Sequence, residues 1–407
     1  MFTDNPVTPI RLEILIETLR AYPHGLARKE VCRLLQPEPL SPDLASGSPV
    51  VVTVKAALEL GLAEESERKL SLTAACRKTK DTRAAILEAF DEKVLSSADV
   101  ESLAVSPKDV NEAIDRAFRA KGEGRTWTKP ELVIHLPGGR TYYAKAAAMP
   151  GYGACKWHAH IPGNAQYGLA DFNPLIVLNE GVTGLAVAIM DATWISGVRT
   201  ASFTVSAARR LARSAASALG FIACGRQARA HLAALMVEFP ITRVICHSRR
   251  EATAARFAEH ARGLGLEAEV AREARRAVEG ADIVVSSTPL DTAMTPFLDA
   301  DWLRPGGFIG AVDLGYSWHK ASLARLDKVV TDDLAQNGVD GTVALNFPPE
   351  RYHGDLGELA AGTKPGRQDA RERNALVSAG FGLGDLAAAV LVYDRARAAG
   401  IGRVLPR

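Results

Sequence analysis

The sequence predicts an α/β protein in which a doubly wound, parallel Rossmann-type sheet is inserted in an α+β domain, preceded by a small winged-helix-like domain. Three observations predict this fold. The chain has 407 residues, more than one ordinary core, and 47% of them are hydrophobic. Residues 219–331 alternate between strand-like and helix-like segments joined by short turns. The segment "LGFIACGRQARAHL" at 219–232 has the apolar start, short turn and amphipathic run typical of a first βα unit.

Charge, cysteine usage and hydropathy argue against several classes of protein. The 49 basic and 47 acidic residues nearly balance, so the net charge of +2 gives no reason to expect a polyanion partner. The cysteines form no C-x-x-C pair, and His158 and His160 have no further ligand at metal-binding spacing, so neither a disulfide framework nor a metal site is expected. The start "MFTDNPVTPI" is unlike a signal peptide, and charges interrupt the apolar runs. We therefore expect a cytoplasmic protein with reduced thiols and no membrane span.

Residues 1–85 have the order of elements of a winged helix. Helical spacing over 9–22, 26–35 and 49–65 is followed by the alternation of a strand at 68–73. The charges of this segment are mixed, and its third helix offers only Thr53 and Lys55 for reading bases. The pattern therefore favours a structural or protein-contact role over DNA binding.

Residues 82–205 and the C-terminal part supply the surrounding α+β domain. Ser106 and Pro107 cap a predicted helix over 106–124. Apolar segments at 131–136 and 140–149 flank a Gly-Gly turn and predict a hairpin, and a second pair of strands is expected within 173–190. A helix is predicted over 199–212, and helices again over 374–400.

The turn at 223–228 carries a reduced form of the dinucleotide fingerprint G-x-G-x-x-G/A. Gly225 stands where the backbone must approach a pyrophosphate, and Ala228 is an accepted small residue at the helix-packing position. Ala223 replaces the first glycine, and it would be strained only if its φ were positive. Ser248, Arg249 and Arg250 follow the next predicted strand, where an acid would hold the free ribose of NAD. These three groups favour NADP(H) over NAD(H).

A second cluster of polar residues lies outside the predicted sheet. "GACKWHAHIPGN" contains Lys156 and Asn164, and "MDATWISGVRTASF" places Arg199 at an expected helix N-terminus. A guanidinium is poorly placed there with respect to the helix dipole, so a carboxylate ligand is the obvious use of Arg199. The alternative is an ion pair between Arg199 and Asp191.

Six segments in order resemble the ornithine cyclodeaminase and mu-crystallin family, over about residues 93–397. They are "CKWHAHIPGN", "AVAIMDATWISGVRTAS", "GFIACGRQARAHL", "AVEGADIVVSSTP", "GELAAGTKPGR" and "SAGFGLGDLAAA". The resemblance implies a substrate-binding and dimerisation domain at 93–205 with 335–400 and a Rossmann NAD(P)-binding domain at 206–334. With the winged-helix-like extension at 1–85, which lies outside the resemblance, we expect three domains. It also implies a homodimer and a small imino, keto or amino acid as substrate.

The resemblance implies roles for individual residues. Lys156 would polarise the reacting C=N or C=O bond, Arg199 would bind the α-carboxylate, and Asn164 would line the substrate site. Asp313 is the candidate for a second catalytic group. The positions expected to bind the cofactor are Ala223, Gly225, Arg226, Gln227, Ala228, Ser248, Arg249, Arg250, Ser287, Thr288 and Val312.

Two departures from the family pattern bear on the reaction. An arginine common on the early strand is replaced at Glu131 and Leu132, which leaves Arg140 or Lys145 as a substitute. The family's catalytic aspartate aligns near Gly315 or Tyr316, two or three positions beyond Asp313.

Three functions compete at this stage. The leading one is an NAD(P)H-dependent reductase of a cyclic imine or of an α-keto or imino acid, which is an amino-acid dehydrogenase in reverse. The second is a cyclodeaminase of ornithine or a related diamino acid. The third is a non-enzymatic, NADPH-binding regulator that contacts DNA through its N-terminal domain.

Overall fold

A computed structural model describes residues 93–289, 293–336 and 345–404, together with residue 19 and the short ranges 26–27, 63–66 and 69–72. The chain divides into two compact units. One consists of Met1–Val94, Asn179–Ile189 and Arg403–Arg407, and the other of Leu95–Leu178 and Met190–Gly402. Within the described ranges, every helix is too short or too polar to cross a membrane.

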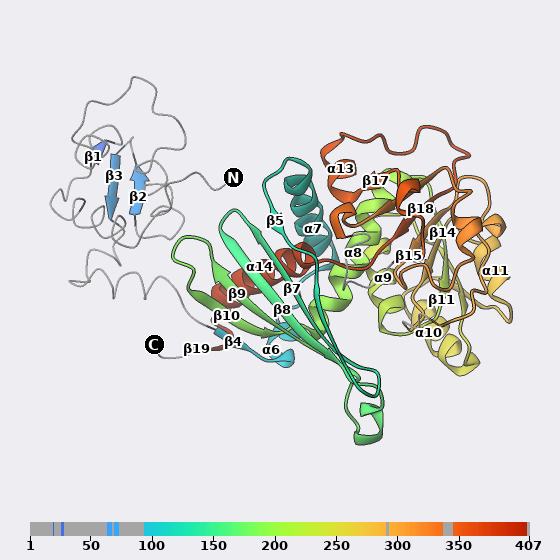
Figure 1. Ribbon diagram of the computed structural model, residues 1–407, viewed down its shortest axis with the longest axis horizontal. Helices are drawn as coiled ribbons and strands as arrows, with labels where there is room; N and C mark the ends of the chain where they lie inside the picture. The colour runs from blue at the N-terminus through green and yellow to red at the C-terminus, as the bar shows by residue number, and fades with distance from the viewer. Residues whose placement is uncertain are drawn as a thin grey trace. The chain divides into compact units, whose positions relative to one another are not determined.

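The described residues near the N-terminus form a three-stranded sheet of order β1-β3-β2 (Figure 1). Its strands are β1 (Leu26–Ala27), β2 (Ala63–Ser66) and β3 (Lys69–Leu72), and β3 lies within the strand predicted at 68–73. The start of the second expected helix and the end of the third were predicted wrongly, because β1 and β2 each pair antiparallel with β3. Leu19, within the predicted first helix, is helical and buried. The rest of the predicted winged-helix elements lies outside the described residues.

A second sheet has the order β19-β4-β10-β9-β8-β7-β5, and β6 pairs with β7. Its strands are β4 (Lys93–Leu95), β5 (Trp127–Thr128), β6 (Leu132–Leu136), β7 (Arg140–Met149), β8 (Tyr152–His160), β9 (Phe172–Glu180), β10 (Ala186–Asp191) and β19 (Arg403–Val404). The predicted hairpin is confirmed, since β6 and β7 pair antiparallel around the Gly-Gly turn. The two strands expected within 173–190 are present as β9 and β10.

Three helices lie between this sheet and the parallel sheet (Figure 1). They are α7 (Pro107–Gly122), α8 (Thr193–Leu211) and α14 (Gly382–Ala399). α14 packs on β7, β8 and α8, and α8 in turn packs on two strands of the parallel sheet. The cap predicted for α7 is confirmed, because the Ser106 side chain accepts the backbone N–H of Asp109. Shorter helices are α6 (Ser97–Ser102) and α13 (Leu356–Ala361).

Helix α8 begins six residues before the predicted start. The Asp191 carboxylate accepts the backbone N–H of Thr193 at 2.9 Å and so satisfies the first turn. Arg199 therefore lies in the second turn rather than at the N-terminus, which corrects the dipole argument made from the sequence.

The predicted parallel sheet is confirmed, with the order β13-β12-β11-β14-β15-β18-β16-β17 and parallel pairing throughout. Its strands are β11 (Ala218–Ile222), β12 (Arg243–His247), β13 (Glu267–Val270), β14 (Ile283–Ser286), β15 (Phe308–Ala311), β16 (Lys328–Thr331), β17 (Gly354–Asp355) and β18 (Asn374–Val377). The helices between them are α9 (Arg226–Met236), α10 (Glu251–Gly263), α11 (Ala274–Glu279) and α12 (Lys320–Leu323). Single-turn 3₁₀ helices cover Asn164–Tyr167, Ala300–Trp302, Leu334–Gln336 and Pro349–Arg351.

Two strands of the parallel sheet come from the range 335–400, which the sequence assigned to the other domain. The helical prediction for 374–377 is wrong, because these four buried residues form β18 between β15 and β16. Because β18 belongs to the parallel sheet and α14 follows it in the chain, this segment connects the parallel sheet to the helix that packs on the antiparallel sheet.

Candidate active site

A cavity of about 630 Å³ opens at the carboxyl ends of β11, β12 and β14. This edge of a parallel sheet is where open α/β folds bind ligands. Seven of the residues predicted to bind cofactor line the cavity: Ala223, Gly225, Ser248, Arg249, Arg250, Ser287 and Thr288. The remaining four, Arg226, Gln227, Ala228 and Val312, do not line it.

Those four residues have other positions around the turn. Arg226 lines a smaller adjoining pocket. Gln227 donates from its side chain to the carbonyl of Ser196 on α8 at 3.4 Å, and Ala228 is fully buried where α9 meets the sheet. Val312 follows β15, and its backbone N–H donates to Ser286.

The turn between β11 and α9 is strained at Ala223, whose φ is +67°. Two hydrogen bonds hold it in this left-handed conformation. The Ala223 N–H donates to the carbonyl of His247 at 2.9 Å, and the Ser287 hydroxyl donates to the carbonyl of Ala223 at 3.3 Å. Gly225 is the N-cap of α9, and no heavy atom lies within 4 Å of the position a Cβ would take. The N-terminus of α9 is therefore open to an anion such as a pyrophosphate.

A buried ion cluster joins three elements of the other side of the molecule. Lys156 on β8 and Arg199 on α8 both donate to the same carboxylate oxygen of Asp385 on α14, at 2.8 Å and 3.0 Å. All three residues are buried. The sequence analysis brought Lys156 and Arg199 forward and missed Asp385. The alternative pairing of Arg199 with Asp191 is wrong, because Asp191 binds the start of α8 instead.

Glycines make room for the Arg199 guanidinium. A Cβ on Gly380 would lie 2.3 Å from Arg199 Nη1, and a Cβ on Gly384 would lie 2.2 Å from the Phe203 ring. The sequence offers one signal for Asp385. It is an acid in the first turn of a helix, and the residues around it are glycine, alanine and leucine.

Of the two candidate substitutes, Lys145 lies at the cluster and Arg140 does not. It lies directly opposite Lys156 in the β7–β8 pairing, and its Nζ is 3.0 Å from Glu131 Oε2 and 2.7 Å from the carbonyl of Gly380. Arg140 is exposed and donates to the carbonyl of Pro137. Glu131 thus anchors a lysine from the neighbouring strand.

The turn after β18 is held by a further acid that the sequence analysis missed. Asp332 is buried and accepts hydrogen bonds from the backbone N–H of Gly380 at 2.6 Å and from the Ser378 hydroxyl at 3.0 Å. Gly380 in turn contacts Lys145 and Arg199. Asp332 is therefore a positioning residue for both cations.

The protonation states follow from burial and from neighbouring charge. Burial, together with the positive charge of Arg199, lowers the pKa of Lys156 to about 7, although Asp385 opposes the shift. Burial alone would raise the pKa of Asp385, but Arg199 and Lys156 together hold that pKa below its ordinary value. Arg199 Nη1 and Asp385 Oδ2 are buried without a hydrogen-bond partner among the described residues. Lys145, Lys156 and Arg199 are matched here by Glu131, Asp332 and Asp385, so the cluster has no excess of cations. The group that a ligand's carboxylate could accept from is the buried Nη1 of Arg199.

Two other predicted site residues do not join this cluster. Asn164 donates to the carbonyl of Ala170 within the loop after β8. Asp313 is fully buried and accepts hydrogen bonds from the hydroxyls of Ser286, Thr288 and Ser317 at 2.7–3.0 Å. Burial raises the pKa of Asp313, and its hydroxyl partners oppose that rise. Its contacts tie the ends of β14 and β15 together, and its expected catalytic role stays a prediction.

The two histidines of β8 were weighed as metal ligands. His158 stacks on Tyr143, and burial lowers its pKa to about 2. In the described ranges, no group of three or more histidine, cysteine or acidic side chains is arranged to hold a metal ion.

Comparison with known proteins gives a consistent result. Residues 90–400 match the profile of the ornithine cyclodeaminase/mu-crystallin family. An alanine dehydrogenase of Archaeoglobus fulgidus is 33% identical over 319 residues, which cover 76% of this chain and 96% of that protein. The structure of an archaeal alanine dehydrogenase dimer with bound NAD has a TM-score of 0.71 and 30% identity, covering 78% of this chain and 99% of that one. The Δ1-pyrroline-2-carboxylate reductase of Thermococcus litoralis, solved with NADH and L-proline, has a TM-score of 0.69 and 26% identity, covering 77% and 100%.

Replacing Ala223 by glycine should stabilise the protein. Glycine adopts a φ of +67° without the contact between Cβ and backbone, so Ala223→Gly should raise the free energy of unfolding by about 0.5–1 kcal/mol. Thermal unfolding of the protein without cofactor measures the change. Ala230→Gly, within α9, is the matched control and should lower the stability by a similar amount. A destabilised Ala223→Gly variant would show that the turn is not strained.

Proposed function

The chain belongs to the ornithine cyclodeaminase/mu-crystallin family, and on that premise we propose that it is an NADPH-dependent reductase of a cyclic imine or an α-imino acid. One observation carries the proposal. The buried Lys156–Asp385–Arg199 cluster is connected through β18 and through Gln227 to the sheet edge that forms the cavity of about 630 Å³. In this proposal the cluster supplies a carboxylate-binding group and a proton donor, and the cavity holds the nicotinamide dinucleotide.

Two connections join the ion cluster to the cavity. Gly380, just after β18, touches the Arg199 guanidinium and accepts a hydrogen bond from Lys145. β18 pairs with β15, which pairs with β14, and the loop after β14 lines the cavity. On the other side, Gln227 of the dinucleotide turn bonds the carbonyl of Ser196, three residues before Arg199. Both connections favour a substrate bound against the nicotinamide end of the cofactor.

The residues divide the chemistry as follows. A bound dihydronicotinamide supplies hydride to the carbon of the C=N bond. Arg199 and Lys145 bind the substrate carboxylate and so fix which carbon faces the cofactor. Lys156 donates a hydrogen bond or a proton to the nitrogen, which receives the electron pair of the C=N bond. Asp385 keeps Lys156 and Arg199 oriented and compensates their charge.

The preference for NADPH rests on the residues after β12. Ser248, Arg249 and Arg250 line the cavity, and no acid occurs before Glu251. Solved relatives contain NAD or NADH. Two guanidinium groups at this position favour the phosphate-bearing cofactor instead.

The wild-type protein separates reduction from deamination. We expect NADPH absorbance to fall with Δ1-pyrroline-2-carboxylate, or with an α-keto acid plus ammonia, and one amino acid to form for each NADPH oxidised. Ammonia release from ornithine with NAD⁺, without net change in cofactor absorbance, would establish the cyclodeaminase instead. The hydrogen bonds that occupy Asp313 favour the first outcome.

Two substitutions should separate binding from chemistry. Arg199→Leu should lower kcat/KM, largely by raising KM, because a charge-assisted carboxylate contact is lost. The loss should correspond to about 2–4 kcal/mol of transition-state binding. Lys156→Ala should reduce mainly kcat. In the wild type, reduction should slow as pH rises through about 7, because Lys156 loses its proton there. That limb of the pH profile should vanish in Lys156→Ala.

The exposed lysine variant Lys129→Ala is the control and should keep the wild-type profile. If both site variants lose melting temperature but retain wild-type kinetics and pH dependence, the cluster serves stability alone.

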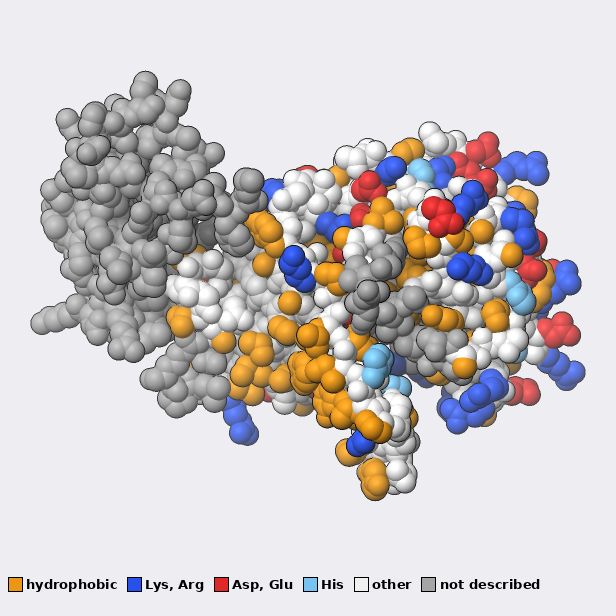
Figure 2. All heavy atoms as spheres, viewed as in Figure 1, with side chains coloured by type: hydrophobic (Ala, Val, Ile, Leu, Met, Phe, Trp, Pro, Cys, Tyr) orange, Lys and Arg blue, Asp and Glu red, His pale blue; other side chains and the backbone are white. Residues whose placement is uncertain are grey.

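We also propose that the protein is a homodimer joined through the outer face of its antiparallel sheet. Leu132 and Trp157 lie in one cross-strand row of this face, and Ile134 lies in the next. Their exposed fractions are 53%, 43% and 45%. Figure 2 shows hydrophobic side chains gathered over these long strands. A second copy of the same face is the partner that such a self-complementary apolar surface fits.

The double substitution Ile134→Lys with Trp157→Glu should convert the dimer to a monomer in sedimentation experiments, because it places charges in an apolar interface. Val237→Lys, at a similarly exposed apolar residue at the end of α9 and outside the antiparallel sheet, should remain dimeric. A wild-type monomer at micromolar concentration would refute the proposal.

A further inference from the structure

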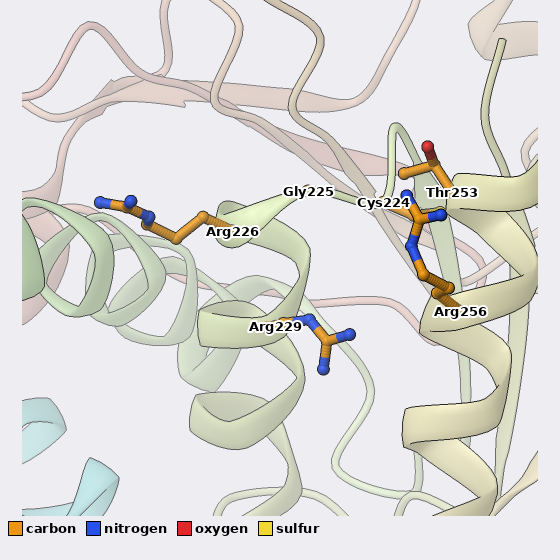
Figure 3. A pocket seen from close by; sticks show the side chains of 6 residues that line it. All are labelled: Cys224, Gly225, Arg226, Arg229, Thr253 and Arg256. Carbon is orange, nitrogen blue, oxygen red and sulfur yellow. The ribbon is translucent and has the colours of Figure 1, made fainter. Parts of the chain in front are cut away.

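A second pocket adjoins the cofactor cavity on the outer side of the dinucleotide turn. Its volume is about 400 Å³, and it is lined by Cys224, Gly225, Arg226, Arg229, Thr253 and Arg256 (Figure 3). Cys224, Gly225 and Thr253 also line the larger cavity, so the two spaces meet at the N-termini of α9 and α10.

Among the described residues, the arginines of this pocket have no counter-ion. Arg226, Arg229 and Arg256 make neither an ion pair nor a hydrogen bond through their side chains with any other described residue. Arginines on nearby elements of the same sheet behave differently: Arg243 and Arg276 both pair with Glu269. Unpaired guanidinium groups gathered around one pocket favour an anionic ligand.

The side chains are arranged in two directions. Figure 3 shows Arg229 on α9 and Arg256 on α10 on facing sides of the gap between the two helices, with Thr253 above Arg256. Arg226 extends from α9 away from this pair. The pair and the threonine hydroxyl thus form a facing set of donors, whereas Arg226 belongs to the other side of the turn.

We propose that Arg229, Arg256 and Thr253 form a subsite for a phosphomonoester, occupied by the ribose phosphate of NADPH. This inference rests on the proposed use of NADPH. The pyrophosphate would occupy the start of α9. The subsite lies next to it, in the gap between α9 and α10. Arg249 and Arg250 line the adjoining cavity from the β12–α10 turn, so arginines from three segments line the two spaces that meet here. The dianion needs such multiple donors to replace its hydration.

Cofactor titrations test the subsite directly. Dissociation constants for NADPH and NADH are measured by cofactor fluorescence for the wild type, Arg229→Gln, Arg256→Gln and the double variant. We expect the double variant to bind NADPH at least about tenfold more weakly while its affinity for NADH stays within about twofold, because only the phosphate contact is lost. The exposed Arg119→Gln is the control for removal of one charge and should match the wild type. Unchanged NADPH affinity, or equal loss for both cofactors, would overturn the assignment.

Inorganic phosphate distinguishes the two sources of a phosphate group. In the wild type it should compete with NADPH and not with NADH, and it should lose this effect in the double variant. Phosphate that still binds the wild type saturated with NADPH would show an independent anion site and overturn the assignment to the cofactor.

A third variant separates this inference from the proposed function. If Arg249→Gln abolishes the NADPH preference while the Arg229 and Arg256 variants keep it, NADPH use stands and the subsite is refuted. If the wild type prefers NADH, the proposed cofactor itself is wrong, and the subsite is refuted with it.

Discussion

The carboxylate of Asp385 is the constraint on which the arrangement of the site depends. It is buried and accepts from Lys156 on β8 and Arg199 on α8, so it fixes a strand and two helices relative to one another. A buried ion of this kind is tolerated only when it is paired, since leaving one partner alone costs several kcal/mol. The glycines of the chain before and within α14 allow the close approach that the pairing needs. Packing of α14 on the sheet and formation of the charge cluster are therefore one event.

The antiparallel sheet serves both the site and the apolar face because side chains alternate along a strand. Lys145, Lys156 and His158 lie on the inner face, while Leu132, Ile134 and Trp157 lie on the outer face. A register shift of one residue would move the lysines to the outer face and the apolar side chains into the cluster. The buried ion pairs thus also specify the register, and with it the composition of the outer face.

Much of the fold follows from local sequence. The parallel sheet is encoded in repeated short apolar strands, and the cap of α7 in Ser106 and Pro107. The sequence does not reveal β18, because "NALV" is a run of four residues with no period that separates strand from helix. Nor does it reveal the start of α8, which depends on a cap from the preceding strand. Asp385 is hidden for a related reason: an acid in the first turn of a helix is ordinary, and only the distant partners on β8 and α8 make it part of the site.

The dinucleotide turn shows how such a chain can depart from a motif and retain its geometry. The first glycine of the fingerprint exists to permit a positive φ, and Ala223 adopts that φ nonetheless. The cost is offset because the strands on either side hold both polar groups of its backbone, through His247 and Ser287. Gly225 differs, because its φ is −87° and no heavy atom lies within 4 Å of the position a Cβ would take. A side chain at Gly225 would be tolerated by the backbone, and it would matter only through the space that a bound pyrophosphate would need. Replacement of the first glycine therefore acts on stability, whereas replacement of the second would act on binding.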